Sequence, residues 1–139
     1  MGYTNIEIYN GALGILAELN DPDNNSDYEE RAPYLIASFC TIAKDLDKRI
    51  RAIEGLDPAQ SFSPVYLSVM DEFPLCDALV PVAMLYVASM LVIDYSSELS
   101  ESLYDKYCDA ISTLAAQVNS ADTSESAVSH PIVQKYFYD

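Results

Sequence analysis

The stretch from Ala78 to Ile93 constrains the fold more than any other part of the sequence. Every one of its sixteen residues except Pro81 and Ser89 is apolar or tyrosine. A helix of that length spans about 24 Å at 1.5 Å per residue, which is shorter than the roughly 30 Å hydrocarbon core of a bilayer. Acidic residues flank the stretch and no basic residue anchors it, contrary to a membrane-spanning segment. We therefore predict a buried central helix of a water-soluble fold, with Asp77 as N-cap and Pro81 in the first turn.

A helix is also predicted near the start of the chain. Thr4 and Glu7 have the spacing of a capping box. Apolar residues then repeat on one helical face, at Ile8, Ala12, Ile15 and Leu19. Gly11 and Gly14 are three residues apart, and small residues at this spacing let another helix approach closely.

The next helix is predicted from Ser26, in capping-box spacing with Glu29, to Glu54, with Gly55 as its stop. Pro33 is tolerated there because it lies near the expected helix start. The inward stripe has a 3.6-residue period and consists of Leu35, Phe39, Ile42, Leu46, Ile50 and Ile53.

The segment after Gly55 breaks the helical pattern. Strand-type residues cluster between Phe62 and Met70 and are bracketed by prolines, which predicts an extended edge segment or a short hairpin. A last helix is expected from a Ser97 cap to about Asn119, with an inward face of Leu99, Leu103, Tyr107, Ala110, Leu114 and Val118. The predicted fold class is all-α: a compact bundle of about four helices with a short extended or β-hairpin insertion between helices 2 and 3.

We expect the C-terminal segment to lie outside this helical domain. Residues 1–119 form the expected helical domain, and residues 120–139 the expected flexible linker and C-terminal arm, because "NSADTSESAVSHP" is small, polar and unpatterned. The arm carries an apolar cluster at Ile132, Val133, Tyr136, Phe137 and Tyr138. Two interpretations stay open: the arm folds back onto its own domain, or it docks on a partner as an arm or added strand.

The charge balance excludes a class of ligand. With 22 acidic and 7 basic side chains, the net charge is −15, which repels phosphate backbones and anionic lipid and excludes tight binding of nucleic acid. Lys44, Lys48 and Arg51 share one helical face. They are either a solvated face paired with nearby acids or a basic patch that meets an acidic patch on a neighbouring subunit. An acidic stripe follows the exposed face of the last helix at Glu98, Glu101, Asp105 and Asp109.

No residue pattern indicates catalysis or a cofactor. Cys40, Cys76 and Cys108 are widely spaced and lie in apolar patterns, and we expect reduced thiols, with no secretory signal at the start of the chain. A zinc site would need closely spaced ligands, whereas the single histidine, His130, lies in the polar tail. Phosphate-binding, dinucleotide-binding and HExxH motifs are missing. We expect a non-enzymatic protein without cofactor or metal, which acts through its surfaces.

One family has a similar pattern. The run "DEFPLCDALVPVAMLYVASML" followed by "SSELSESLYDKYCDAISTL" resembles the head–tail connector (adaptor) proteins of tailed bacteriophages and prophages. The acidic lead-in Asp71–Asp77 matches, with Cys76 where the family usually has proline. The helix matches at Ala83, Leu85, Tyr86, Val87, Ala88 and Leu91, and the last helix at Leu103, Tyr107 and Ala110. The N-terminal "IYNGALGILAEL" is similar to the family's first helix, although Ala17 stands where glycine is frequent.

The resemblance implies a mostly helical subunit that assembles into a ring beneath the portal. DNA would pass through this ring without specific binding, and the portal and tail-completion proteins would be its partners. The protein would lie in the bacterial cytoplasm during assembly and then in the virion. The acidic stripe would line the channel, since like charges repel the DNA. The alternatives are an acidic DNA-mimic inhibitor of a DNA-binding protein and a small cytosolic helical regulatory protein.

Overall fold

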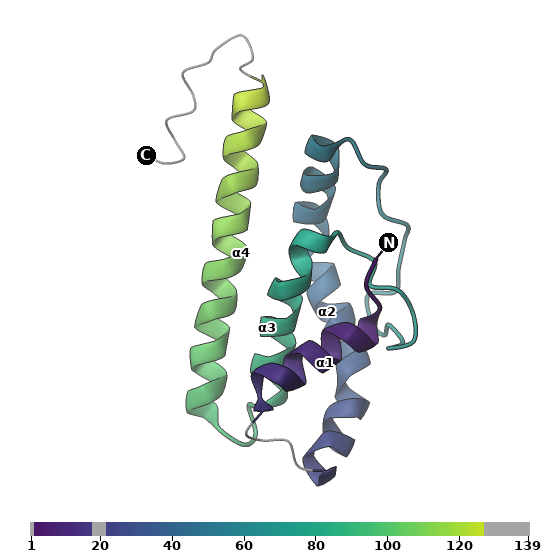
Figure 1. Cartoon of the computed structure of the whole chain (residues 1–139), viewed down its shortest axis with the longest axis vertical. Coiled ribbons are helices and arrows are strands. Elements are labelled where there is room, and N and C mark those ends of the chain that lie inside the picture. Colours follow the sequence, from purple (N-terminus) through teal and green to yellow (C-terminus); the bar gives the residue numbers. More distant parts are fainter. Residues whose placement is uncertain (1, 18–21, 127–139) are drawn as a thin grey trace.

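A computed structural model describes residues 2–17 and 22–126; for residues 22–26 and 122–126 it describes the backbone alone. Within these ranges the α-helices are α1 (Asn5–Ile15), α2 (Pro22–Glu54), α3 (Val80–Leu91) and α4 (Ser97–Ser126), and a 3₁₀ turn, η2 (Asp77–Leu79), precedes α3 (Figure 1). The prediction of an all-α fold with about four helices is confirmed.

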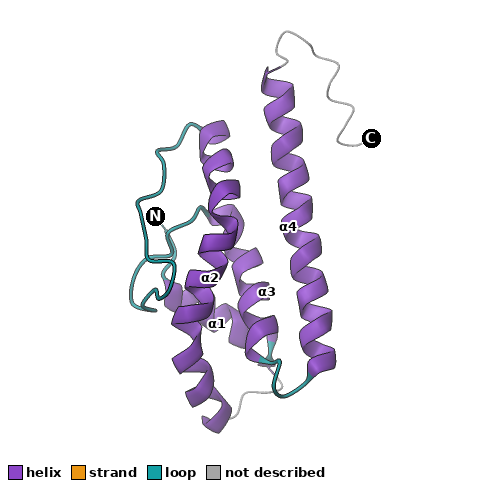
Figure 2. Ribbon diagram, turned by 180° about the vertical axis from the view of Figure 1, so that it is seen from behind, coloured by secondary structure: helices purple, strands orange, loops and turns teal. Residues whose placement is uncertain are grey.

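Helix α3 lies at the centre of the fold. It packs against α1, α2 and α4, and between Val80 and Val92 only Pro81 is exposed. Figure 2 shows α3 between α2 and α4. The predicted central helix is therefore confirmed, with Pro81 in its first turn as expected. In the described part of the chain, no helix combines the length and apolar character needed to cross a membrane.

Helix α1 crosses α3 at close range. The Glu7 carboxylate accepts a hydrogen bond from the backbone N–H of Thr4 at 2.8 Å, as the predicted capping box requires. A Cβ placed on Gly11 would lie 2.4 Å from the Sδ and Cε of Met84, whereas one on Gly14 would meet nothing within 4 Å. The predicted close approach is therefore confirmed at Gly11 and wrong at Gly14. The predicted inward position of Ile15 is also wrong, because its side chain is exposed at the end of the helix.

Helix α2 begins earlier than predicted and buries a broader face. It starts at Pro22, so Ser26 and Pro33 lie inside the helix and Ser26 cannot be its N-cap. Ile42, expected in the core, is 55% exposed. Phe39, Leu46 and Ile50 are buried as predicted, and Leu35 and Ile53 are half-buried. The buried face extends further round the helix than the large residues indicated, because it also includes Ala32, Ile36, Cys40, Ala43 and Asp47.

Arg31 of α2 caps the C-terminal end of α3. Its guanidinium donates hydrogen bonds to the carbonyl oxygens of Met90 at 2.7 Å and Leu91 at 3.1 Å. These carbonyls have no partner within the helix, and a cation at a helix C-terminus is stabilised by the helix dipole. A second contact of Arg31, with the Asp27 carboxylate, holds the side chain on α2.

The start of α4 differs from the prediction by one residue. The hydroxyl of Ser96 accepts a hydrogen bond from the N–H of Leu99 at 3.1 Å, so Ser96 and not Ser97 is the N-cap. Similarly, Asp77 does not cap α3, because it lies within the preceding 3₁₀ turn. In both cases the sequence offers adjacent polar residues, and the path of the chain selects between them.

Helix α4 packs one face on α3 and α2. Leu103, Tyr107 and Val118 are buried as predicted, and the other expected inward residues are half-buried. The helix continues to Ser126, beyond the predicted end near Asn119. This stretch contains no glycine or proline to end the helix, and Ser120 is still buried against the body.

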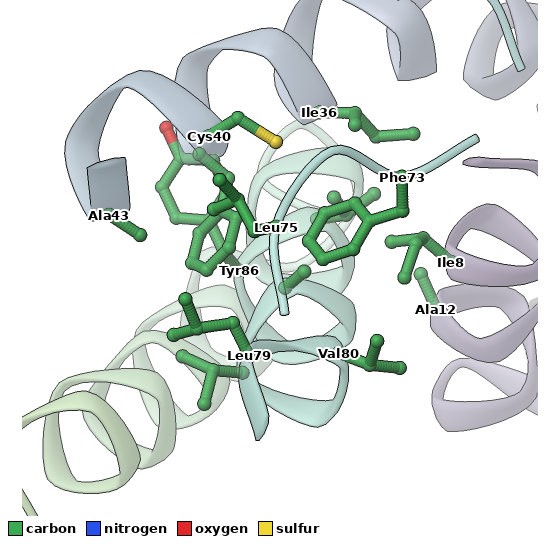
Figure 3. Close-up of a cluster of buried hydrophobic side chains, with 14 of the residues drawn as sticks. Ile8, Ala12, Ile36, Cys40, Ala43, Phe73, Leu75, Leu79, Val80 and Tyr86 are labelled. Carbon is green, nitrogen blue, oxygen red and sulfur yellow. The ribbon is translucent and has the colours of Figure 1, made fainter. Parts of the chain in front are cut away.

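Aromatic rings join the three longer elements of the core. Phe39 of α2 contacts Tyr86 of α3 and Tyr107 of α4, with ring centroids 5.8 and 6.2 Å apart. Phe73, from the segment before α3, stacks on Phe39 at 6.4 Å. Figure 3 shows Phe73 and Leu75 entering the core between α1 and α2. The connection between α2 and α3 thus contributes to the core.

Candidate functional site

The segment from Gly55 to Cys76, hereafter the α2–α3 loop, is a non-helical insertion between α2 and α3 as predicted, but of the two predicted forms the β-hairpin is not found. Its strand-type pairing within the described residues is a single isolated antiparallel bridge between Thr4 and Glu72. Its backbone bonds instead to the helices. The N–H of Leu67 donates to the carbonyl of Pro33 at 3.1 Å, and the N–H of Asn5 donates to the carbonyl of Asp71 at 2.9 Å.

A buried ion pair on α2 holds both ends of this loop. Asp47 is 2% exposed, and its Oδ2 accepts a hydrogen bond from Nε of Arg51 at 2.9 Å. The other oxygen of Asp47 accepts from the N–H of Cys76 at 2.7 Å. Arg51 also donates to the carbonyls of Asp57 and Pro74, both at 3.1 Å. One carboxylate and one guanidinium therefore fix the beginning and the end of the loop.

The backbone N–H of Cys76 is needed to hold the end of the loop, because it is the group that Asp47 binds. A proline at this position would have no N–H to donate and could not make this hydrogen bond.

The anchored loop holds apolar side chains in solvent. Val65, Tyr66 and Met70 are 63%, 48% and 79% exposed. Tyr66 contacts Tyr34 of α2 edge to face, with ring centroids 5.1 Å apart, and Tyr34 is itself exposed. Val65, Tyr66, Met70 and Tyr34 are called the loop patch below. Exposed aromatic and methionine side chains of this kind are typical of protein–protein contacts.

Between the loop and the C-terminal end of α2 lies an open groove, called the loop groove, with a volume of about 1180 Å³. Its apolar lining includes Leu56, Phe62 and Tyr66. Five exposed carboxylates also line it, from Glu54, Asp57, Asp71, Glu72 and Asp77. Arg51 is the basic side chain in the lining, and it is already paired with Asp47. The groove therefore carries a net negative charge.

The structure separates the predicted basic patch. Lys44 and Lys48 are exposed, and neither forms an ion pair within the described residues. Arg51 does not belong to an open patch, because its guanidinium is half-buried and bonded to Asp47 and to two loop carbonyls. Arg49 points elsewhere and donates a hydrogen bond to Asn119 of α4. Two lysines thus remain as available cations on this part of α2.

The structure describes the predicted acidic stripe but not the predicted docking arm. Glu98, Glu101, Asp105 and Asp109 are all exposed on α4, as predicted, whereas their channel-facing role remains a prediction. The predicted docking arm lies outside the described residues, and so do its members Ile132, Val133, Tyr136, Phe137 and Tyr138.

The three cysteines are buried or half-buried in the fold. Cys40 and Cys76 are buried and Cys108 is half-buried, and all have free thiols. Burial, together with the nearby Asp47, raises the pKa of Cys76 to about 12 and also raises the pKa of Cys40. Thiols with raised pKa values are poor nucleophiles. Across the described ranges, no three His, Cys, Asp or Glu side chains lie close enough together to hold a metal ion.

Comparisons of the chain with protein-family models, with curated proteins and with solved structures found no match. What the protein does must therefore be argued from its own surfaces.

Sequence reasoning missed Asp47 as the organising residue of the loop. The available signal was its position: Asp47 follows Ile36, Cys40 and Ala43 on one helical face and has an arginine at i+4. A charged residue inside an inward-facing stripe has to be paired when the helix packs. The loop partners, by contrast, have no signal in the local pattern.

Proposed function

We propose that the protein is a non-enzymatic assembly subunit, a head–tail connector (adaptor) of a tailed bacteriophage or prophage that forms a ring between portal and tail. The proposal draws on the resemblance of residues 71–77, the central helix and the last helix to that family. The acidic lead-in of the resemblance corresponds to the returning limb of the α2–α3 loop, which continues directly through η2 into α3.

The observation that carries the proposal is the loop patch. Tyr34 of α2 and Val65, Tyr66 and Met70 of the loop remain in solvent, although Asp47 and Arg51 fix that loop to α2. A preorganised surface loses little conformational entropy when a partner binds. Aromatic and methionine side chains are also enriched in interfaces. Both properties favour a role in subunit contacts.

The charge distribution supports a channel role for α4. Glu98, Glu101, Asp105 and Asp109 face solvent along one side of this helix, and Lys106 is the basic residue among them. A wall of carboxylates repels phosphates and lets DNA slide without being held. In the proposed ring this stripe faces the channel, so DNA passes through without specific binding.

Further contacts follow from the remaining surfaces. Lys44 and Lys48 meet an acidic surface of a neighbouring subunit, and the arm residues 132–138 dock on the portal or a tail-completion protein. The protein then resides in the bacterial cytoplasm during assembly and in the virion afterwards.

The test is co-assembly with the portal protein encoded in the same genome. Purified protein and portal are mixed and separated by size, and the complexes are viewed by negative-stain electron microscopy. We expect a ring of this protein on the portal, and the ring should be lost in the variant Tyr66→Ser/Met70→Ser. Both substitutions lie at exposed positions, so the monomer should stay folded. Absence of any complex with folded protein would overturn the proposal.

The second candidate is an acidic inhibitor that imitates DNA, which the run of exposed carboxylates on α4 also favours. It differs in its partner: such a protein forms a tight complex with a basic DNA-binding protein and is displaced by DNA. The same size separation, carried out with a lysate in the presence and absence of competing DNA, distinguishes the two.

A further inference from the structure

One wall of the loop groove is a stretch of backbone without partners. Residues 56–63 contain no helix, turn or bend, and residues 58–63 line the groove. Among the described residues, nothing bonds to the N–H or C=O groups of Ala59, Gln60, Ser61 and Phe62. Such unpaired backbone can accept an added strand from another chain.

The loop around this stretch is held in place independently of it. Arg51 binds the carbonyl of Asp57 immediately before it, and the hydroxyl of Ser63 accepts from the N–H groups of Val65 and Tyr66 immediately after it. Leu67 then bonds to Pro33 of α2. The free backbone is therefore presented between fixed points, which lowers the entropic cost of pairing with a partner.

The chemistry of the groove selects its occupant. Glu54, Asp57, Asp71, Glu72 and Asp77 surround apolar side chains, and within the described ranges none of the five forms an ion pair. Arg51 cannot neutralise them because its charge is balanced by the buried Asp47. An occupant has to supply positive charge at the rim and apolar side chains over Leu56 and Phe62.

We propose that the loop groove binds an extended segment of a partner protein in which lysine or arginine alternates with apolar residues. The segment pairs with the backbone of residues 59–62 and places its cations against the rim carboxylates. This inference deepens the proposed function by giving the chemistry of one assembly partner, and it rests on that proposal only for assigning the segment to the portal or tail.

The test measures binding of a labelled synthetic peptide in which lysine alternates with valine and tyrosine, by fluorescence anisotropy with the full-length protein. A peptide with glutamate in place of lysine is the control and should not bind. Asp57→Asn/Asp71→Asn/Glu72→Gln should weaken binding about tenfold or more, since several charge pairs at the rim are lost together. Glu98→Gln/Glu101→Gln/Asp105→Asn changes the net charge equally on α4 and should weaken binding much less.

Backbone pairing is tested separately at Gln60. Gln60→Pro removes an N–H that no described residue uses, whereas Gln60→Ala keeps it. We expect the proline variant alone to lose affinity, at unchanged thermal stability. Equal affinity of these two variants would overturn the pairing, and equal losses in the two charge variants would overturn the site in favour of non-specific attraction.

The chain's own C-terminus is the competing occupant. An unlabelled peptide with the sequence of residues 131–139, PIVQKYFYD, is added to the complex of the protein with the labelled lysine peptide. We expect little displacement, because this peptide carries one lysine and ends in aspartate. Strong displacement would assign the groove to the C-terminus of a second copy and overturn the proposal. Ring formation on the portal is measured independently, so failure here leaves the proposed function standing.

Discussion

Asp47 and Arg51 lie one turn apart on α2 and together fix the α2–α3 loop, with Nε of Arg51 2.9 Å from Oδ2 of Asp47. Asp47 also binds Cys76, and Arg51 binds the carbonyls of Asp57 and Pro74. The pair thus connects the end of α2 to the start of η2. The loop patch and the loop groove both depend on this connection.

The first prediction concerns this pair. Asp47→Ala leaves Arg51 half-buried without its counter-ion and the N–H of Cys76 without an acceptor, so we expect it to reduce the free energy of unfolding by about 2–4 kcal/mol. Asp45→Ala, at an exposed position of the same helix, should change it by less than about 0.5 kcal/mol. Urea denaturation measures both. Similar values for the two variants would contradict the anchoring role.

The two helical glycines should respond to alanine with opposite signs. Gly11→Ala brings a Cβ within 2.4 Å of the Met84 side chain and should destabilise the protein by about 1 kcal/mol, because α1 or Met84 must move. Gly14→Ala enters open space and should stabilise it by about 0.5–1 kcal/mol through helix propensity. Thermal unfolding of both variants is the measurement. A stabilising Gly11→Ala would show that α1 does not pack closely on α3.

The N-cap of α4 can be located by two neighbouring alanine substitutions. Ser96→Ala removes the acceptor for the N–H of Leu99 and should cost about 1 kcal/mol. Ser97→Ala lies in the first turn, makes no comparable bond among the described residues, and should cost little. Chemical denaturation separates the two outcomes. A larger loss for Ser97→Ala would place the start of α4 one residue later.

Stability should decrease at alkaline pH. Burial raises the pKa of Tyr9 and Tyr107 from the ordinary 10.0 to about 12, and that of Cys76 from 9.0 to about 12. These groups ionise at lower pH in the unfolded chain, so unfolding releases protons and is favoured as the pH rises. Their contribution is complete below about pH 9 and is lost progressively up to about pH 12, by about 1.4 kcal/mol per pH unit for each proton released.

Tyr107→Phe provides the matched variant for this pH dependence. It removes one of the ionising groups, so its free energy of unfolding should fall less steeply than that of the wild type between about pH 10 and pH 12. Thermal melts followed by far-UV circular dichroism across this range measure the slopes. Identical slopes would show that Tyr107 is not protected from ionisation in the folded protein.

The acidic stripe gives a prediction that bears on the proposed function. Reversal of Glu98, Glu101 and Asp105 to lysine should leave the fold intact, because all three side chains are exposed. In assembled particles it should slow DNA ejection, since cations in the channel wall would hold phosphates. The measurement is the rate of DNA ejection from particles that carry the variant. An unchanged rate would contradict the assignment of the stripe to the channel wall.

The general architecture was predictable because it depends on local patterns. The apolar stretch from Ala78 to Ile93 indicated a helix buried on all sides, and Thr4 with Glu7 indicated the start of the first helix. Both are visible without knowledge of any partner, since helix periodicity and capping involve residues within about four positions of one another. The exposed acidic stripe on α4 was recognised for the same reason.

The candidate site was not predictable in this way. The α2–α3 loop is fixed by contacts between residues far apart in the chain, such as Asp47 with Cys76 and Pro33 with Leu67. Strand-type residues suggested an extended segment or a hairpin, and propensity could not decide between them because it does not specify which backbone groups will pair. Ile42 was placed in the core because it continues a stripe of large apolar residues, and the local pattern does not mark the edge of the buried face.

The amino-acid sequence by itself thus determined an all-α chain with a buried central helix and a strongly acidic surface. The tertiary structure decided how far the buried face of α2 extends, which serine caps α4, and that Asp47 and Arg51 bind the loop instead of solvent. The physical reason is that burial of a charge is tolerated only where a partner is provided. That partner comes from a distant part of the chain, which only the folded structure brings into place.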